Sequence, residues 1–215
     1  YIDNIQLGID NINVVESYGG RFLMRMQPSE RWTFDIATYI NRSRADTASW
    51  DLAAGNYNSL AMTRQPMRDD VEIYSVTSSY DLDFATLTAS GSYMHRDTTS
   101  VSDTSRYMQW QRTPDRCATL VNSGADCSAG QLADFYDVVD YQSYSALFPQ
   151  QEMDAWTAEL RLSSDTSGPI NWTVGGFYAD RRVRVANPQV NTDPVTGEVI
   201  QPLQIATARY IDDTL

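Results

Sequence analysis

Two cysteines are the residues of this sequence with the most sharply defined chemistry. Cys117 and Cys127 lie in a long polar stretch. Between them stand Asn122, Ser123 and Gly124, which favour turns and can bring the two thiols close enough to bond. We therefore predict a disulfide, which implies an oxidising compartment such as the periplasm or the cell surface. The alternative is a pair of free thiols.

Charged side chains on predicted strands are a second group of candidates. Arg21, Arg25, Glu159 and Arg161 alternate with apolar residues, so they fall on the polar side of their strands. Guanidinium groups suit anionic chelates, which makes the arginines candidate ligand-binding residues. The alternative is that they are structural partners of neighbouring strands.

Aromatic residues in the long polar stretches are a third group. They are candidates for contact with a small-molecule ligand, and the alternative is that these stretches pack on themselves. The candidates are Trp50, Tyr57, Tyr107, Trp110, Tyr141 and Tyr144.

Other residue types argue against catalysis and against a metal. His95 is the single histidine and has no cysteine or carboxylate at ligand spacing, so no zinc site is expected. Asn191, Asp193 and Glu198 lack a full calcium-ligand array, and we interpret them as turn residues. The sequence has no Gly-x-Ser-x-Gly, no nucleotide loop and no Cys-x-x-Cys. We expect neither an enzyme nor a cofactor.

The composition limits the class of protein and its partners. The 28 acidic and 16 basic residues give a net charge of -12, which would repel a nucleic-acid backbone. A length of 215 residues, 42% of them hydrophobic, indicates a folded chain and not a disordered one. The sequence has no run of about 18 apolar residues, so no membrane-spanning helix is expected.

The elements that must position these residues are predicted strands with alternating apolar and polar side chains. They form three hairpins, with short turns inside each hairpin and long polar loops between them. The predicted strands are residues 18–27, 32–44, 71–80, 86–98, 154–164 and 170–182, and the predicted loops are residues 45–70, 99–153 and 183–215. Within the loops we expect a short helix near 129–139 and a small hairpin at 193–197.

The difference between the two ends of the hairpins indicates a membrane protein. Loops longer than about 12 to 15 residues are uncommon in compact domains. Transmembrane β-barrels combine short periplasmic turns with long extracellular loops, and only alternate residues of their strands face lipid. Trp32, Tyr93, Trp156, Trp172 and Tyr178 fit the interfacial aromatic girdles of such a barrel, although a sandwich core could also use them. We expect six strands of a larger antiparallel barrel and thus a portion of a longer protein.

Five short segments resemble TonB-dependent outer-membrane receptors. They are Tyr-Ile-Asp-Asn-Ile at 1–5, Ser-Tyr-Gly-Gly-Arg at 17–21, Thr-Arg-Gln-Pro at 63–66, Glu-Leu-Arg-Leu-Ser-Ser at 159–164 and Trp-Thr-Val-Gly-Gly-Phe-Tyr at 172–178. The resemblance covers essentially the whole chain. It implies a barrel of about 22 strands that surrounds a plug domain.

The resemblance also implies a location, partners and an activity. The location is the outer membrane of a Gram-negative bacterium, with the bilayer and its lipopolysaccharide around the barrel. The activity is energy-dependent import of a scarce, bulky nutrient such as a ferric siderophore, cobalamin or an oligosaccharide. Energy would come from the TonB–ExbB–ExbD complex through the plug, but the sequence contains no TonB box and no plug, so no residue is assigned to that contact.

Two other functions share the same strand pattern. A passive porin would have the barrel without the plug, and the sequence upstream of Tyr1 would distinguish it. A soluble, secreted β-sandwich that binds carbohydrate also alternates apolar and polar faces. A charge placed on the apolar side of a strand would block membrane assembly specifically. This substitution therefore distinguishes a membrane barrel from the soluble sandwich.

Overall fold

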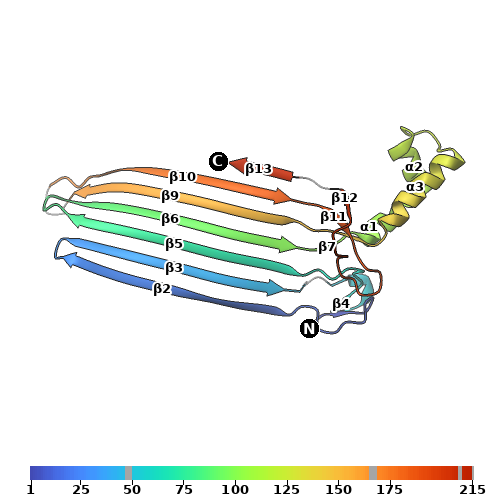
Figure 1. Cartoon of the computed structure of the whole chain (residues 1–215), viewed down its shortest axis with the longest axis horizontal. Coiled ribbons are helices and arrows are strands. Elements are labelled where there is room, and N and C mark those ends of the chain that lie inside the picture. The colour runs from blue at the N-terminus through green and yellow to red at the C-terminus, as the bar shows by residue number, and fades with distance from the viewer. Residues whose placement is uncertain (47–49, 165–168, 208–209, 215) are drawn as a thin grey trace.

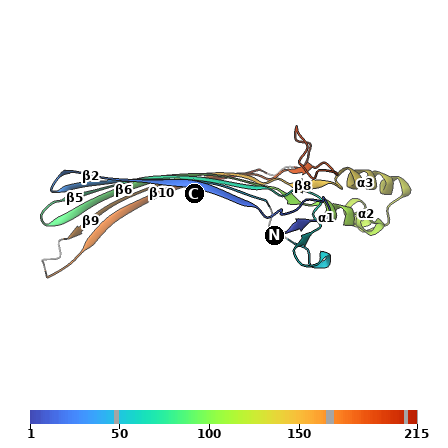
Figure 2. The same ribbon diagram turned by 90° about the horizontal axis from the view of Figure 1, so that it is seen from below.

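The protein is built around one layer of long antiparallel strands, with smaller elements gathered at one end (Figure 1). The computed structural model describes all residues except 47–49, 165–168, 208–209 and 215. Seen edge-on, the strands remain a single curved layer and the helices extend beyond its end (Figure 2). In the described part of the chain, no helix is long and apolar enough to cross a bilayer.

The main sheet has seven strands in the order β13-β10-β9-β6-β5-β3-β2. Its neighbouring strands are all antiparallel. The strands are β2 (Val15–Ser29), β3 (Trp32–Ala45), β5 (Met67–Asp81), β6 (Ala85–Ser100), β9 (Gln150–Ser164), β10 (Thr173–Ala186) and the short β13 (Tyr210–Thr214). This confirms the predicted all-β antiparallel class. The described strands do not close on themselves, because β2 and β13 form two edges.

The six predicted long strands are present, and most extend further toward the long loops than predicted. The predicted strand 71–80 begins at Met67, and the predicted strand 154–164 begins at Gln150. Many of the added residues are polar, such as Arg68 and Asp70, so they break the apolar alternation while their backbones continue the pairing. The predicted turn at residues 165–169 lies mostly outside the described residues.

The predicted loops contain regular structure that we term the loop assembly. The predicted helix near 129–139 is confirmed as α3. The elements of the loop assembly are β1 (Asp3–Asn4), η1 (Leu52–Ala54), β4 (Asn58–Ser59), β7 (Ser102–Asp103), α1 (Ser105–Trp110), α2 (Pro114–Val121), α3 (Ala129–Tyr141), β8 (Ser145–Leu147), β11 (Gln189–Asn191) and β12 (Ile205–Thr207).

The predicted loop 183–215 contains more strand structure than the small hairpin expected there. Besides β11 and β12, this region contains β13, which pairs with residues 182–186 of β10. The predicted hairpin at 193–197 is present, since the amide of Asp193 donates to the Glu198 carbonyl at 2.8 Å. Short strands such as β13 depend on hydrogen bonds to a distant partner, and local alternation carries little signal for them.

The small hydrophobic core lies in the loop assembly and not in the main sheet. Val101, Ala146 and Val190 are buried together, with Phe148, Val199 and Leu203 packed around them. These residues belong to or flank the four-stranded sheet β12-β11-β8-β7. The main sheet, in contrast, exposes many of its large apolar side chains. A contiguous exposed apolar surface of this kind is typical of a site of contact with a membrane or another protein.

Two glycines mark places where neighbouring backbones approach closely. A Cβ on Gly19 would lie 2.5 Å from the carbonyl oxygen of Ile40, and one on Gly175 would lie 2.7 Å from that of Leu160. The following glycines, Gly20 and Gly176, have nothing within 4 Å of such an atom. Glycine is therefore required by the shape of the sheet only at the first position of each pair.

We expect Gly175→Ala to destabilise the protein by about 1 to 3 kcal/mol, because the added methyl group collides with backbone. Gly176→Ala is the matched control and should be neutral or slightly stabilising, because it restricts the unfolded chain. Denaturant unfolding followed by tryptophan fluorescence compares the two variants. Equal midpoints would contradict the close approach.

Candidate functional site

The two faces of the main sheet have different chemistry. Cross-strand partners share a face, and the pairs Ile36–Val76, Val76–Gly91 and Gly91–Ala158 therefore define one side, which we name the apolar face. The alternate residues define the opposite side, which we name the hydroxyl face because serine and threonine predominate there. Its members include Ser75, Thr77, Ser79, Thr88, Ser90, Ser92 and Thr157.

The apolar face is bounded by two rows of aromatic rings. Near the short turns, the rings of Trp32 and Tyr80 lie 6.3 Å apart. Toward the loop assembly, Tyr93 lies 6.5 Å from Tyr74 and 4.4 Å from Trp156. Between these rows the aliphatic side chains are open to the surroundings, as shown by Val76 at 45% and Leu160 at 55% exposed. Of the predicted girdle residues, Trp32, Tyr93 and Trp156 lie in these rows, and Trp172 directly precedes β10 at the end of the sheet with the short turns. Tyr178 pairs with Ala158 and therefore lies inside the apolar band.

The hydroxyl face is joined by polar contacts between strands. The hydroxyls of Ser92 and Thr157 are 2.7 Å apart across β6 and β9. Arg25 binds Asp35 with two hydrogen bonds of 2.6 and 2.9 Å, and Arg96 binds Asp69 with two of 2.7 and 2.9 Å. This side of the sheet is suited to contact with water or with other polar groups.

The three arginines predicted to bind ligand share the hydroxyl face but do not form one site. Arg21 and Arg25 lie on β2, whereas Arg161 lies on β9, with three strands between them. At about 4.8 Å per strand, this separates them by roughly 19 Å. Arg161 lies 3.6 Å from Glu159 of the same strand, whereas Arg25 pairs with Asp35 of the neighbouring strand β3.

Beyond the second aromatic row, the apolar face changes abruptly into a charged belt. The belt comprises the cross-strand rows Arg42, Arg68, Asp70, Glu72, His95, Asp97, Glu152, Asp154, Arg182 and Arg184. Arg42 donates to Glu72 at 2.5 Å, and Arg184 donates to Glu152 at 3.0 Å. The sequence analysis missed this belt, because only the register of five strands aligns its members.

The prediction that His95 has no carboxylate close enough to share a ligand is wrong, because strand pairing brings Asp154 next to it. Pairing of β6 with β9 places Asp154 opposite His95, with Oδ1 2.8 Å from the ring Nδ1. His95, Glu152 and Asp154 offer possible ligand atoms within 4.8 Å of one another. Asp154 also accepts from the Tyr93 hydroxyl at 2.6 Å, and Glu152 accepts from Arg184. Each of these groups thus has a hydrogen-bonded protein partner, and we assign no metal to them.

The predicted loop aromatics are divided between two parts of the loop assembly. Trp50 and Tyr57 lie beside β4, with ring centroids 6.1 Å apart. Tyr107 and Trp110 lie on α1, with 61% and 69% of their surfaces exposed. Tyr141 ends α3, and Tyr144 follows it and is also exposed. The aromatics therefore form exposed groups on both sides of the assembly instead of one pocket.

The loop assembly is held together by buried polar contacts between distant segments. Asp103 accepts from the amides of Met62 at 2.6 Å and Ser105 at 2.9 Å. The buried hydroxyls of Thr63 and Thr192 lie 3.2 Å apart, although these residues are 129 positions apart in the chain. All three predicted loops thus contribute to one structure at the end of the sheet.

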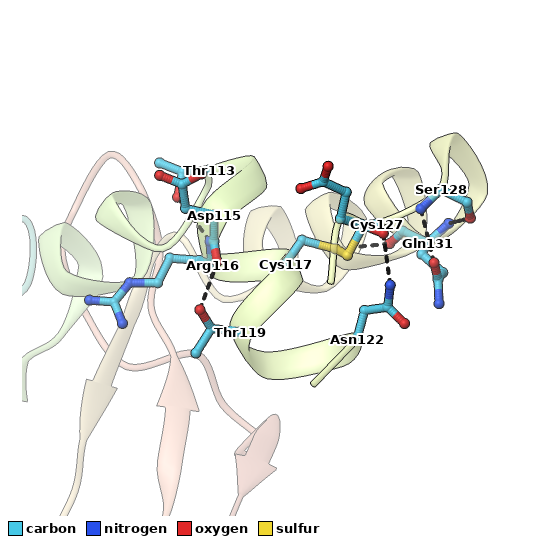
Figure 3. The surroundings of a disulfide bond; sticks show 10 residues. Thr113, Asp115, Arg116, Cys117, Thr119, Asn122, Cys127, Ser128 and Gln131 are labelled. Carbon is cyan, nitrogen blue, oxygen red and sulfur yellow. Dashed lines mark hydrogen bonds between the residues drawn. A yellow bond between two sulfur atoms is a disulfide. The ribbon is translucent and has the colours of Figure 1, made fainter. Parts of the chain in front are cut away.

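The predicted disulfide between Cys117 and Cys127 is present and staples α2 to the segment before α3 (Figure 3). Cys117 lies inside α2, whose N-cap Thr113 accepts from the Arg116 amide. Helix α3 begins with a capping box in which Ser128 and Gln131 exchange hydrogen bonds. Two well-defined helix starts thus fix the two chain segments that the disulfide joins.

Two polar contacts lie farther out in the loop assembly. Arg112 donates to Asp140 at 2.7 Å, which raises the pKa of the guanidinium, and it also covers the Tyr136 ring at 4.2 Å. Asp193 accepts from the amides of Thr196 and Val195, each at 2.8 Å. These bonds lower the pKa of Asp193. Asp193 is therefore a turn residue, as predicted.

The chain was also compared with known proteins. A scan against protein-family models and searches among curated proteins and solved structures found no match.

We expect the variant with both Cys117→Ser and Cys127→Ser to lose about 3 kcal/mol of local stability, since the disulfide restricts the unfolded segment. Amide hydrogen exchange would show faster opening of α2 and the N-terminal half of α3. The long strands β5 and β6 serve as the internal control and should keep their protection. Unchanged exchange in α2 would contradict a stabilising disulfide.

The Asp193 turn should weaken in acid. Because the pKa of Asp193 is lower in the folded turn than in the unfolded chain, the stabilisation is complete above the unfolded pKa of about 3.9 and is lost as pH falls through the folded value. Exchange protection of the Val195 and Thr196 amides measures this. The variant Asp193→Ala should lack both the protection and its pH dependence, whereas Asp193→Asn should lack only the pH dependence.

Proposed function

We propose that the six long strands are part of the transmembrane β-barrel of a TonB-dependent receptor in a bacterial outer membrane. The observation that carries this proposal is the uncovered apolar face between two aromatic rows. In water, a contiguous apolar surface of this size is unfavourable. In a bilayer, the same face is matched to lipid, and the rings lie at the two interfaces.

The dimensions of the strands fit this environment. A tilted strand needs about 9 to 11 residues to cross the hydrocarbon core, and the six long strands have between 14 and 16 residues. Tyr74 and Tyr80 mark the two aromatic rows on β5 and are separated by about 20 Å along the strand, at roughly 3.4 Å per residue. An apolar band of roughly 25 Å is typical of outer-membrane barrels.

The proposed orientation follows from the two ends of the sheet. Short turns would face the periplasm, and the loop assembly would face the outside of the cell. The hydroxyl face would then line the interior of the barrel, where Arg21, Arg25 and Arg161 can be hydrated or can contact a plug. The disulfide of the loop assembly agrees with an extracytoplasmic location.

The proposed activity is energy-dependent import of a scarce, bulky nutrient, such as a ferric siderophore, cobalamin or an oligosaccharide. The exposed aromatics of the loop assembly would make the first contact with this ligand, because such side chains offer large contact areas at low entropic cost. Energy would be supplied by the TonB–ExbB–ExbD complex through a plug domain. This part of the proposal rests on the sequence resemblance.

Two alternative functions, a passive porin and a soluble carbohydrate-binding sandwich, require different structures. A passive porin shares the two-faced sheet, and a plug domain of roughly 100 or more residues encoded before Tyr1 would exclude it. A soluble carbohydrate-binding sandwich needs a second layer packed on the apolar face. The described residues form no such layer, so this alternative is less well supported.

Ile36→Arg tests the membrane assignment. A guanidinium near the bilayer midplane should cost about 2 to 4 kcal/mol and block assembly. Ala37→Arg is the matched control, since the adjacent residue lies on the hydroxyl face and should be tolerated. The measurement is the amount of folded, heat-modifiable protein in outer-membrane fractions. Equal loss for both variants, or a native protein that is soluble without detergent, would refute the barrel.

A further inference from the structure

Helices α2 and α3 lie beyond the end of the main sheet, at the outer end of the loop assembly (Figures 1 and 2). We name residues 114–141 the helical arm. One face of α3 is covered by the rest of the loop assembly: Val139 is buried, and Arg112 covers the Tyr136 ring at 4.2 Å. The residues of this face recur at positions i, i+3, i+4 and i+7 of the helix and are Leu132, Phe135, Tyr136 and Val139.

The opposite face of α3 is open and carries both charged and apolar side chains. Its four exposed residues have the same helical spacing and are Asp134, Asp137, Val138 and Tyr141. Val138 is 55% exposed and Tyr141 is 57% exposed. Among the residues that the structure describes, neither Asp134 nor Asp137 forms a salt bridge, whereas Asp140 does. We name these four residues the acidic–apolar stripe.

The two carboxylates of the stripe destabilise the helix that carries them. The C-terminal half of a helix has a negative dipole end, so acidic side chains are unfavourable there and basic ones are favourable. Helix α3 nevertheless has no basic residue in its last turn. Asp134 and Asp137 also lie three positions apart, where like charges repel each other. Residues that break a local rule without compensation are expected at functional positions.

Asp140 shows how such a carboxylate is compensated inside the protein. It has the same unfavourable position near the end of α3, but the guanidinium of Arg112 donates to it at 2.7 Å. No equivalent cation reaches Asp134 or Asp137 within salt-bridge distance in the described part of the chain. A cation supplied by another molecule would therefore complete the stripe.

Charge limits the class of that molecule. The helical arm has five acidic residues and one basic residue, namely Asp115, Asp126, Asp134, Asp137, Asp140 and Arg116. An acidic surface repels nucleic acid and anionic lipid headgroups. A second copy of the chain would place the same carboxylates against each other, because a symmetric dimer pairs identical surfaces. A basic protein partner has the complementary charge.

We propose that the acidic–apolar stripe docks a basic amphipathic helix of another protein. Arginine or lysine side chains of the partner pair with Asp134 and Asp137, and its apolar side chains cover Val138 and Tyr141. A helix is the fitting shape, because residues at this spacing form a ridge that packs into the groove of a second helix.

The expected complex is transient. Four residues offer much less than the roughly 800 Å² per partner that a stable interface buries. Exposed ion pairs are also screened by salt, so the affinity should fall as ionic strength rises. This docking goes beyond nutrient import and does not depend on the membrane orientation proposed above.

The test measures binding of fluorescent synthetic helices to the full-length protein by fluorescence anisotropy. The first peptide carries arginines beside a row of leucines, the second has glutamate for each arginine, and the third has serine for each leucine. Only the first should bind well. Combined Asp134→Asn and Asp137→Asn should weaken its binding roughly 10-fold, since two exposed ion pairs are lost. Combined Val138→Ser and Tyr141→Ser should also weaken it.

The matched control combines Asp115→Asn and Asp126→Asn, which removes the same charge from exposed positions of the arm outside the stripe. It should bind the first peptide like the wild type. Unchanged binding by the Asp134 and Asp137 variant, an equal loss in the control, or equal binding of the serine peptide would overturn the proposal. Self-association that Tyr141→Ser abolishes, measured by sedimentation velocity, would also overturn it by identifying a second copy as the partner.

Amide hydrogen exchange separates docking from a structural role of the two carboxylates. Combined Asp134→Asn and Asp137→Asn should leave exchange in α3 unchanged or slower, because the substitutions remove repulsion within the helix. Faster exchange in α3 would show that the carboxylates stabilise the arm, and the proposal would then fail.

Discussion

The structure depends on a single layer of strands whose two faces have opposite chemistry. Each strand alternates its side chains, so one face collects aliphatic and aromatic groups while the other collects hydroxyls. Strand pairing satisfies the backbone within the layer, and no second layer of the described residues packs on either face. The lengths of the strands, the positions of the rings and the place of the charged belt all follow from this division.

The loop assembly is held together mainly by buried polar contacts and not by a large apolar core. Its apolar core is small, and its buried residues include Ser59, Thr63, Ser105, Ser145 and Thr192. Such groups are stable in the interior only when they are hydrogen-bonded, and the contacts through Asp103 and between Thr63 and Thr192 provide this. A disulfide then fixes the outermost helices, where few apolar contacts exist. Specific polar pairing replaces the large core that a chain of this length usually has.

The sequence predicts the elements that depend on residues close together in the chain. Alternation located the six long strands, and helical spacing located α3. Helix α2 was missed although Thr113 and Pro114 form a recognisable start, because its eight residues lie inside a polar stretch. The contact of His95 with Asp154 and the charged belt were not predictable, since they require the register between strands far apart in sequence.

The joining of the three loops through Thr63, Asp103 and Thr192 has an immunological and an evolutionary consequence. In the proposed orientation, the loop assembly is a discontinuous epitope on the cell surface, built from segments that meet only in the folded state. Antibodies against linear peptides of these loops should recognise the native surface poorly. Sequence change in one loop is constrained by its contacts with the other two loops. Substitutions should therefore accumulate at exposed positions such as Tyr107 and Trp110, while the buried hydroxyls of Thr63 and Thr192 stay fixed.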